Sequence, residues 1–451
     1  MVTPPDRTPG YARRLGLFSG TMAVVGGIIG GGIFRAPAAV AERAETTTVT
    51  LVAWLVGGVV AMAGAFCFGE LGARRPRAGG GYVYLRETWG PLPAFLYGWT
   101  LLLVIATGAI AAVAVMFADY TLALFGLPAH LTLPVAVGAI VLLSGINDIG
   151  VRSGAVTQNV FTVLKLGALA ALIAAGLALA APAHEAARAP AAAAESAGVV
   201  AFGTALVPIL FTYGGWQQAN FIAEEIIEVE RTLPRALVLG VGLVVLVYVA
   251  ANVAYLRVLG VAGLASSDAP AADVMARVLG PVGSRVIAAG IAVSTFGFLN
   301  LVILVTPRVL HAMAADGLFF PRFAILHSTR RTPSAAIWLQ AVWGVVLTLS
   351  GTFAQLVDYV TFGDWIFFGL TVAGLFVYRR RDRDEVPGGV RGFRVPGYPW
   401  TPAFFVLAAI YVVVSAVAAN PRNALIGTAL IGLGVPVYRY WAERRRRLKS
   451  G

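Results

Sequence analysis

Two glycine clusters interrupt apolar segments of the sequence, and the backbone groups released there could bind a charged ligand. Five of the seven residues from Gly26 to Gly32 are glycine, and Gly214 and Gly215 form a second cluster. Each glycine costs a helix interior about 1 kcal/mol relative to alanine, so such clusters favour an unwound backbone. Unwound backbone at membrane depth is tolerated only where it is buried or lines a cavity.

The polarity of the released groups matches an α-amino acid zwitterion. The N–H groups at the start of a half-helix lie at its positive dipole end and suit a carboxylate. Carbonyl groups freed at a facing break suit an ammonium group. Close helix packing is the alternative explanation for either cluster alone, because small residues let backbones approach.

Lys165 is the third candidate for chemistry, because it is the only lysine inside a predicted membrane segment. It follows Arg152 by 13 residues, which is about 20 Å along a helix and too far for the side chain to reach the interface. An ionisable residue at this depth indicates function, and burial disfavours its charged form. Two roles remain open: a group that exchanges protons, or a fixed cation bonded to carbonyls of the unwound segment.

The elements that would position these residues are membrane-spanning helices. Of the 451 residues, 58% are hydrophobic and 12% are charged, against about 25% charged residues in soluble domains. A helix that crosses a bilayer needs about 20 apolar residues. We therefore predict an all-α membrane protein with one transmembrane domain at 1–451. The twelve predicted helices lie at 16–42, 50–73, 92–119, 131–150, 154–180, 199–226, 236–258, 283–313, 334–352, 357–378, 399–419 and 423–442.

The basic charge of the chain is explained by membrane topology. On the twelve-helix prediction, 26 of the 34 arginines and lysines fall on one side of the membrane, 7 on the other, and Lys165 inside. The positive-inside rule then predicts a multi-pass inner (plasma) membrane protein with both termini in the cytoplasm. The net charge of +12 needs no nucleic-acid partner, although the run at 444–447 could also contact anionic lipid.

An Ala/Pro-rich connector at 180–198 divides the chain into two five-helix halves. We expect a first repeat at 15–180, a second repeat at 199–378, and two further helices at 399–442. Five helices separate the two glycine clusters, and this odd number means that the halves cross the membrane in opposite directions. Paired glycine-interrupted segments in inverted halves point to a transporter's binding site near the middle of the membrane.

Several long motifs strengthen this interpretation. In chain order they read GGIIGGGIFRAP, CFGELGARRPRAGGGYVYLRETWGPLPAFLYGW, NDIGVRSGAVTQNVFTVLKL, FTYGGWQQANFIAEEIIEVERTLPRAL and STFGFLN. Together they resemble the amino acid–polyamine–organocation (APC) superfamily, and in particular its L-type and bacterial sodium-independent amino acid transporters. The resemblance covers about residues 15–400 and implies the LeuT-type fold, with two inverted five-helix repeats plus two C-terminal helices.

The resemblance also implies a substrate site. The positions that it assigns to substrate binding are Ile28, Ile29, Gly30, Gly31, Gly32, Phe211, Thr212 and Gly214. The first five would bind the carboxylate through their backbone, and the last three would face the amino group and the occluding side. Phe211 would close over the substrate, with a plain core aromatic as the alternative. Two residues depart from the family pattern: Gly31 stands where serine is usual, and Arg35 lies unusually close to the motif, near the outer gate.

The resemblance gives Lys165 a place as well. In sodium-independent relatives, a lysine at the matching position stands in for a sodium ion between the helices that correspond to 16–42 and 283–313. Ser294 and Thr295 would be its neighbours on the second of these helices. This correspondence argues against sodium coupling, whichever of the two roles Lys165 has.

The sequence therefore predicts a secondary active transporter of amino acids that works by alternating access, independently of sodium, by exchange or proton symport. A small apolar lining favours neutral amino acids. The alternative is an antiporter of polyamines or cationic amino acids, which needs an acidic residue in the pocket, and none of the matched pocket positions is acidic. Asp358 and Asp364, which border the helix at 357–378, are weaker candidates for substrate recognition.

Other functional classes lack the residues that they require. An enzyme would need a nucleophile–base pair or a metal cluster at membrane depth, and neither is evident. Cys67 is the only cysteine, and the four histidines show no ligand spacing, so we expect no metal site and no cofactor. The sequence contains no GxxxxGK[ST] loop, which argues against an ATP-driven pump. The broken helices favour alternating access over a channel. The expected partners are an amino acid, the lipid bilayer and, for a symporter, protons.

Overall fold

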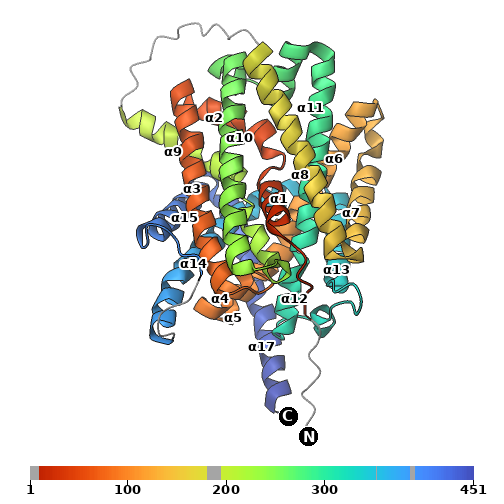
Figure 1. The fold of residues 1–451 in the computed structure, drawn as a ribbon, viewed down its shortest axis with the longest axis vertical. Helices are drawn as coiled ribbons and strands as arrows, with labels where there is room; N and C mark the ends of the chain where they lie inside the picture. Colours follow the sequence, from red (N-terminus) through yellow and green to blue (C-terminus); the bar gives the residue numbers. More distant parts are fainter. Residues whose placement is uncertain (1–9, 180–194, 352, 386–391, 451) are drawn as a thin grey trace.

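The computed structural model describes residues 10–179, 195–351, 353–385 and 392–450 as a bundle of helices (Figure 1). Within these ranges the backbone forms no strand beyond one isolated bridge between Leu15 and Ile226. The α-helices are α1 (Leu17–Ile28), α2 (Gly32–Ala44), α3 (Thr47–Arg74), α4 (Gly81–Trp89), α5 (Pro91–Thr100), α6 (Ala106–Phe125), α7 (Thr132–Ile149), α8 (Val151–Ala174), α9 (Glu195–Thr212), α10 (Val229–Ala265), α11 (Pro270–Val305), α12 (Pro307–Ala315), α13 (Ser334–Ser350), α14 (Phe353–Glu385), α15 (Trp400–Ala419), α16 (Pro421–Gly432) and α17 (Gly434–Ser450). Short helical segments of other pitch are η1 (Leu101–Ile105), η2 (Ala129–Leu131), η3 (Ala175–Leu179), η4 (Trp216–Glu225) and η5 (Pro321–Ala324).

Local sequence signals explain where several helices begin. Proline lacks an N–H group and its fixed φ suits the first helical turn. It occupies the first position of four of the described α-helices, at Pro91, Pro270, Pro307 and Pro421. Before α3, the Thr46 hydroxyl accepts a hydrogen bond from the N–H of Val49 at 3.2 Å, which satisfies one N–H group that the helix itself leaves without a partner.

The helical composition confirms an all-α protein with membrane-spanning helices. Among the described residues, seven helical stretches are long and apolar enough to cross a bilayer, and the bent pair α1–α2 makes an eighth. The helix α13 is apolar but has only 17 residues. The number of twelve spans therefore stays a prediction.

Several predicted helices are less regular than their apolar patterns indicate. The segment predicted at 92–119 contains α5, the π-helical η1 and α6. The segment at 423–442 is divided at Leu433 into α16 and α17. After α9 the chain continues as 3₁₀ turns in η4 rather than as an α-helix. Most of the Ala/Pro-rich connector lies outside the described residues.

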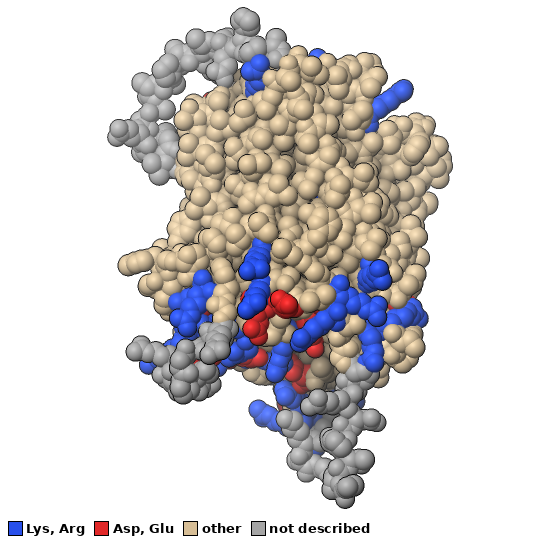
Figure 2. All heavy atoms as spheres, viewed as in Figure 1, with Lys and Arg blue, Asp and Glu red and all other residues tan. Residues whose placement is uncertain are grey.

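The broken helix α1–α2 lies inside the bundle, where α1 packs against α8, α10, α11 and η4 (Figure 1). Eight of the twelve residues of α1 are buried, including Val24, Val25 and Ile28. On the face drawn in Figure 2, charged side chains gather at the end that holds α12 and α17, and the rest of the surface is almost free of charge. The drawn face thus has a wide apolar zone beside a charged end (Figure 2).

Candidate functional site

The first glycine cluster interrupts a helix as predicted. The helix α1 ends at Ile28 and α2 begins at Gly32, and their axes differ by 45°. Between them Ile29 adopts extended backbone angles, with φ −78° and ψ 92°. The i to i−4 hydrogen-bond ladder is therefore lost over a few residues, and the polar groups released there must find other partners.

Side chains from three other helices satisfy the carbonyl groups of this break. The Lys165 ammonium, from α8, donates to the carbonyl oxygen of Ile29 at 2.6 Å and lies 3.4 Å from that of Gly26. The Ser294 hydroxyl, from α11, donates to the carbonyl oxygen of Gly30 at 3.0 Å. From α10, the Tyr248 hydroxyl donates to Ile28 at 3.1 Å and the Tyr255 hydroxyl to Ile33 at 3.2 Å.

The N–H groups on the other side of the break have no such partners. No acceptor for the N–H groups of Gly31, Gly32 or Ile33 occurs among the described residues. Gly31 is half-buried and Gly32 is exposed, whereas Ile33, which follows them, is buried. Free N–H groups at a helix N-terminus favour an anion such as a carboxylate.

The second glycine cluster forms a matching break between α9 and η4. The helix α9 ends at Thr212, and Gly215 has a φ of +109°, a conformation that L side chains rarely adopt. The Thr212 hydroxyl donates to its own helix, to Pro208 at 2.7 Å. In the described part of the chain, no donor reaches the carbonyl groups of Tyr213 or Gly214, so these oxygens are available to an ammonium group.

The two breaks touch each other through their backbones. A Cβ atom on Gly215 would lie 2.0 Å from the carbonyl oxygen of Gly27, and one on Gly27 would lie 2.7 Å from that of Gly215. The Tyr248 hydroxyl also joins the breaks, because it lies 3.1 Å from the carbonyl oxygen of Ile28 and 3.5 Å from that of Thr212. The two breaks therefore lie against each other inside the bundle.

The other predicted site residues lie around this junction. A Cβ on Gly30 would meet Phe298 at 3.2 Å, and one on Gly31 would meet the Met116 sulfur at 2.6 Å. Gly214 is half-buried, and Phe211, also half-buried, lies edge-on to Trp365 with ring centroids 6.5 Å apart.

The residues near Lys165 differ in what they contact. Lys165 is fully buried, and a Cβ on Gly297 of α11 would lie 3.4 Å from its nitrogen. Thr295, the second predicted neighbour, donates within its own helix, to Ile291 and Ala292. Arg35 is exposed on α2. The described residues contain no group of three His, Cys, Asp or Glu side chains that could hold a metal ion.

Sequence reasoning missed the two tyrosines of α10 and the residues that pack against the glycines. Tyr248 and Tyr255 are seven residues apart, which places them on one face of a helix. Two hydroxyl groups at this spacing inside a buried apolar helix are a signal for polar partners nearby. Met116 and Phe298 give no comparable signal, because each resembles an ordinary core residue.

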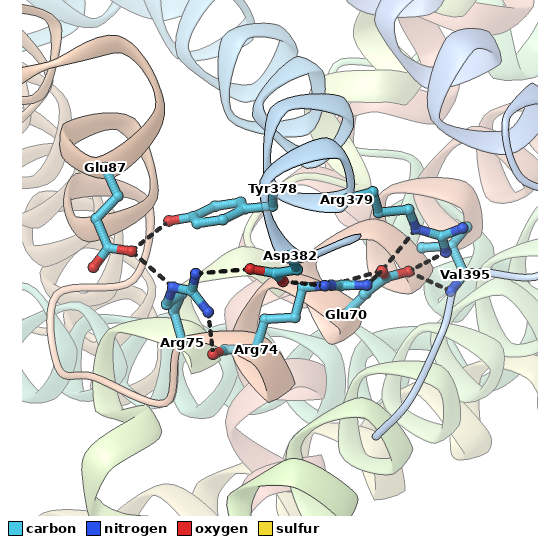
Figure 3. Close-up of polar contacts among 8 residues, drawn as sticks. All are labelled: Glu70, Arg74, Arg75, Glu87, Tyr378, Arg379, Asp382 and Val395. Atoms are coloured by element: carbon cyan, nitrogen blue, oxygen red, sulfur yellow. Dashed lines mark hydrogen bonds and ion pairs between the residues drawn. The ribbon is translucent and has the colours of Figure 1, made fainter. Parts of the chain in front are cut away.

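A network of charged side chains ties α3, α4 and α14 together at the arginine-rich end (Figure 3). Glu70 pairs with Arg74 at 2.7 Å and with Arg379 at 2.5 Å, and accepts the N–H of Val395 at 2.7 Å. Asp382 bonds both Arg74 and Arg75. Burial alone would lower the pKa of Arg75, but its contacts with Asp382 and with Glu87 on α4 raise that pKa above its ordinary value.

A second ion pair at the same end is completely buried. Arg308 of α12 bonds Glu225 at 2.7 Å, and the two side chains are 0% and 1% exposed. The carbonyl oxygen of Glu225 also accepts the N–H groups of Arg14 and Leu15 at 2.9 and 3.0 Å. The backbone of Glu225 therefore ties the segment before α1 to the end of η4, and its side chain ties η4 to α12.

Comparison with known proteins identifies the family. A model of the amino acid permease family matches residues 15–437. The chain belongs to this family of the APC superfamily. The assignment confirms the resemblance seen in the motifs and places the permease among amino acid transporters.

Several curated relatives match the permease over nearly its whole length. It is 32% identical to the b(0,+)-type amino acid transporter 1 of Mus musculus over 98% of this chain and 92% of the relative. It is 32% identical to the human Large neutral amino acids transporter small subunit 2, over 96% of this chain and 81% of the relative. It is 31% identical to the Serine/threonine exchanger SteT of Bacillus subtilis (strain 168), over 97% and 98%.

Proposed function

We propose that this permease is a secondary active transporter that binds an amino acid between its two helix breaks and moves it across the cytoplasmic membrane by alternating access. One observation carries the proposal: the free N–H groups of Gly31 and Gly32 and the free carbonyl groups of Tyr213 and Gly214 belong to two breaks whose backbones touch. A zwitterion is complementary to this pair of group types. Transport rather than catalysis agrees with the transporters among its relatives.

The coupling that we propose is independent of sodium. The Lys165 ammonium already bonds the carbonyl oxygens of the first break, and Ser294 bonds the next one along. A sodium ion at this place would compete for the same oxygen atoms with a fixed positive charge beside it. Transport then proceeds by exchange of one amino acid for another, or by symport with protons.

The architecture that goes with this function has twelve spans in the LeuT-type arrangement. The repeats are 15–180 and 199–378, the helices at 399–442 follow them, and both termini lie in the cytoplasm. The gathering of arginines at one end of the bundle supports this orientation (Figure 2). The contact between the two breaks supports the pairing of the repeats.

The substrates that we propose first are neutral amino acids. Relatives named for large neutral amino acids and for serine and threonine support this class, and the second relative is named as an exchanger. The apolar surroundings of the breaks, including Met116 and Phe298, agree with it. The alternative is an antiporter of polyamines or cationic amino acids, which needs an acidic residue in the pocket. The carboxylate of Asp364 near the second break and the b(0,+)-type relative keep this alternative open.

Uptake into proteoliposomes tests the proposal. The purified permease is reconstituted and screened with labelled amino acids and polyamines, in liposomes preloaded with unlabelled substrate, with and without sodium and a pH gradient. We expect rapid entry of at least one neutral amino acid that does not depend on sodium. The proposed function would be overturned if no labelled amino acid entered any of the preloaded liposomes.

A further inference from the structure

A small cavity adjoins the second helix break. Its volume is about 40 Å³, and it lies between α5, α6, η4, α11 and α14. Its polar lining residues are Tyr97, Gln217, Gln218, Thr306 and Asp364. A cavity of this size holds a small polar group or a few water molecules.

Asp364 is the charged group of this cavity. Among the described residues, no basic side chain and no hydrogen-bond donor contacts its carboxylate, which differs from Glu70, Glu225, Asp316 and Asp382, all paired with arginines. An isolated carboxylate in an apolar bundle is costly unless a cation or donors reach it. Its environment therefore favours a positively charged ligand.

One neighbouring lining group, Gln218, offers a further acceptor. The side-chain oxygen of Gln218 is buried and has no hydrogen-bond partner. Gln217 uses its side-chain oxygen to accept the N–H of Gly215 at 3.0 Å, so this residue is fixed to the second break. A ligand group with several donors and a positive charge would satisfy both Asp364 and Gln218, whereas an apolar group would satisfy neither.

The cavity adjoins the second break, which forms one side of the proposed zwitterion site. Gln217 and Gln218 follow Gly215 directly along the chain. Trp365, the residue after Asp364 on α14, is in edge contact with Phe211 on α9. Asp364 therefore lines a cavity beside the second break and precedes the α14 residue that contacts Phe211.

We propose that Asp364 forms a subsite for a positively charged group on the substrate's side chain, so that the permease accepts amino acids with a terminal amine as well as neutral ones. This inference rests on the proposed function, because it assigns the side-chain end of the same site. The carboxylate binds the ammonium group directly, and Gln218 accepts one of its remaining hydrogens. The subsite supplies the acidic residue that the positions predicted for substrate binding lack.

The test compares lysine with norleucine, which has an unbranched side chain of the same number of carbon atoms but no amine. Entry of each labelled compound is measured in proteoliposomes preloaded with an unlabelled neutral amino acid. We expect the parent to take up both. Asp364→Asn should lower the ratio of lysine to norleucine entry at least about tenfold, the size expected for a hydrogen bond to a charged group, with norleucine entry within about twofold of the parent.

Asp119→Asn is the matched control, because Asp119 is exposed on α6 and bonds only Thr132 among the described residues. It should leave the ratio unchanged. Gln218→Met is a second variant that removes an acceptor but no charge, and it should lower the ratio by a smaller factor. Thermal stabilisation of the purified parent by lysine and by norleucine gives a readout that needs no variant, and lysine should stabilise at lower concentration.

Three outcomes decide the matter. A parent that takes up norleucine but not lysine overturns the subsite and leaves the proposed function standing. The subsite is also overturned if Asp364→Asn and the parent have the same ratio of lysine entry to norleucine entry. This holds even if the variant changes the pH dependence of norleucine entry. A parent that takes up no amino acid at all overturns the proposed function and, with it, the subsite.

Discussion

Replacement of Lys165 should lower the transport rate, because its ammonium group holds the unwound backbone of the first helix break. Its ammonium group donates to the carbonyl oxygen of Ile29 at 2.6 Å and lies 3.4 Å from that of Gly26. The side chain is fully buried. Lys165→Met removes the charge and keeps most of the volume, whereas Lys165→Ala also opens a cavity between α8 and α11.

The magnitude follows from the shorter of the two contacts. A hydrogen bond that involves a charged donor is worth about 1.5–3 kcal/mol, and a buried acceptor left without a partner costs about 1–3 kcal/mol. A loss of about 3 kcal/mol in the unwound conformation corresponds to roughly a hundredfold lower population of that conformation. The cavity in Lys165→Ala should cost further stability, by about 2–4 kcal/mol.

The assay is the initial rate of amino acid exchange in proteoliposomes with equal amounts of reconstituted protein, without sodium, across the neutral pH range. Lys165→Met should lower the rate by roughly a hundredfold. Ser294→Ala removes one neutral hydrogen bond to Gly30, worth about 1 kcal/mol, and should lower the rate only severalfold.

The pH profile of the same experiment separates the two roles of Lys165. A lysine that exchanges protons gives a parent whose rate varies with pH near neutrality and a Lys165→Met variant whose remaining rate does not. A fixed cation gives a variant that is slower at every pH with an unchanged profile. The reasoning is refuted if Lys165→Met retains the rate of the parent, or if the parent requires sodium.

Three further predictions concern backbone packing, a buried ion pair and topology. Gly215→Ala should abolish uptake, because its Cβ would lie 2.0 Å from the carbonyl oxygen of Gly27, whereas Gly138→Ala, which meets nothing within 4 Å, should match the parent; equal uptake by both variants would contradict the packing argument. Arg308→Met should lower the free energy of unfolding by about 3–5 kcal/mol, because Glu225 stays buried without its partner, and thermal stability equal to the parent's would disprove this. Reporter fusions at both termini should report the cytoplasm and one in the Ala/Pro-rich connector the opposite side, and a terminus found outside would refute the twelve-helix topology.

The chemistry of the first break could be predicted from the sequence because it depends on local backbone preference. A run of glycines in an apolar segment indicates unwinding, and the structure places the break between Ile28 and Gly32. The depth of Lys165 follows from helix geometry alone. The sequence left open whether Lys165 exchanges protons or is a fixed cation bonded to carbonyl groups. It could not give the bond to the carbonyl oxygen of Ile29, because that bond depends on how α8 packs against α1.

Long-range contacts could not be read from the sequence. The close approach of Gly27 and Gly215 joins residues far apart along the chain, and a glycine pattern does not say which glycine meets which. Tyr248 acquires its partners, and Asp364 its cavity, only when α10 and α14 pack beside the breaks. The 3₁₀ turns of η4 could not be predicted from the sequence either, because the apolar pattern there is compatible with an α-helix.

The central claim is that the two breaks hold the charged ends of an amino acid. An experimental structure of the permease with the amino acid identified by the uptake screen tests it most directly. The account predicts the substrate carboxylate within hydrogen-bond distance of the N–H groups of Gly31 and Gly32, and the substrate ammonium at the carbonyl groups of Tyr213 and Gly214. A substrate bound elsewhere in the bundle, or bound between the breaks with these ends reversed, would contradict it.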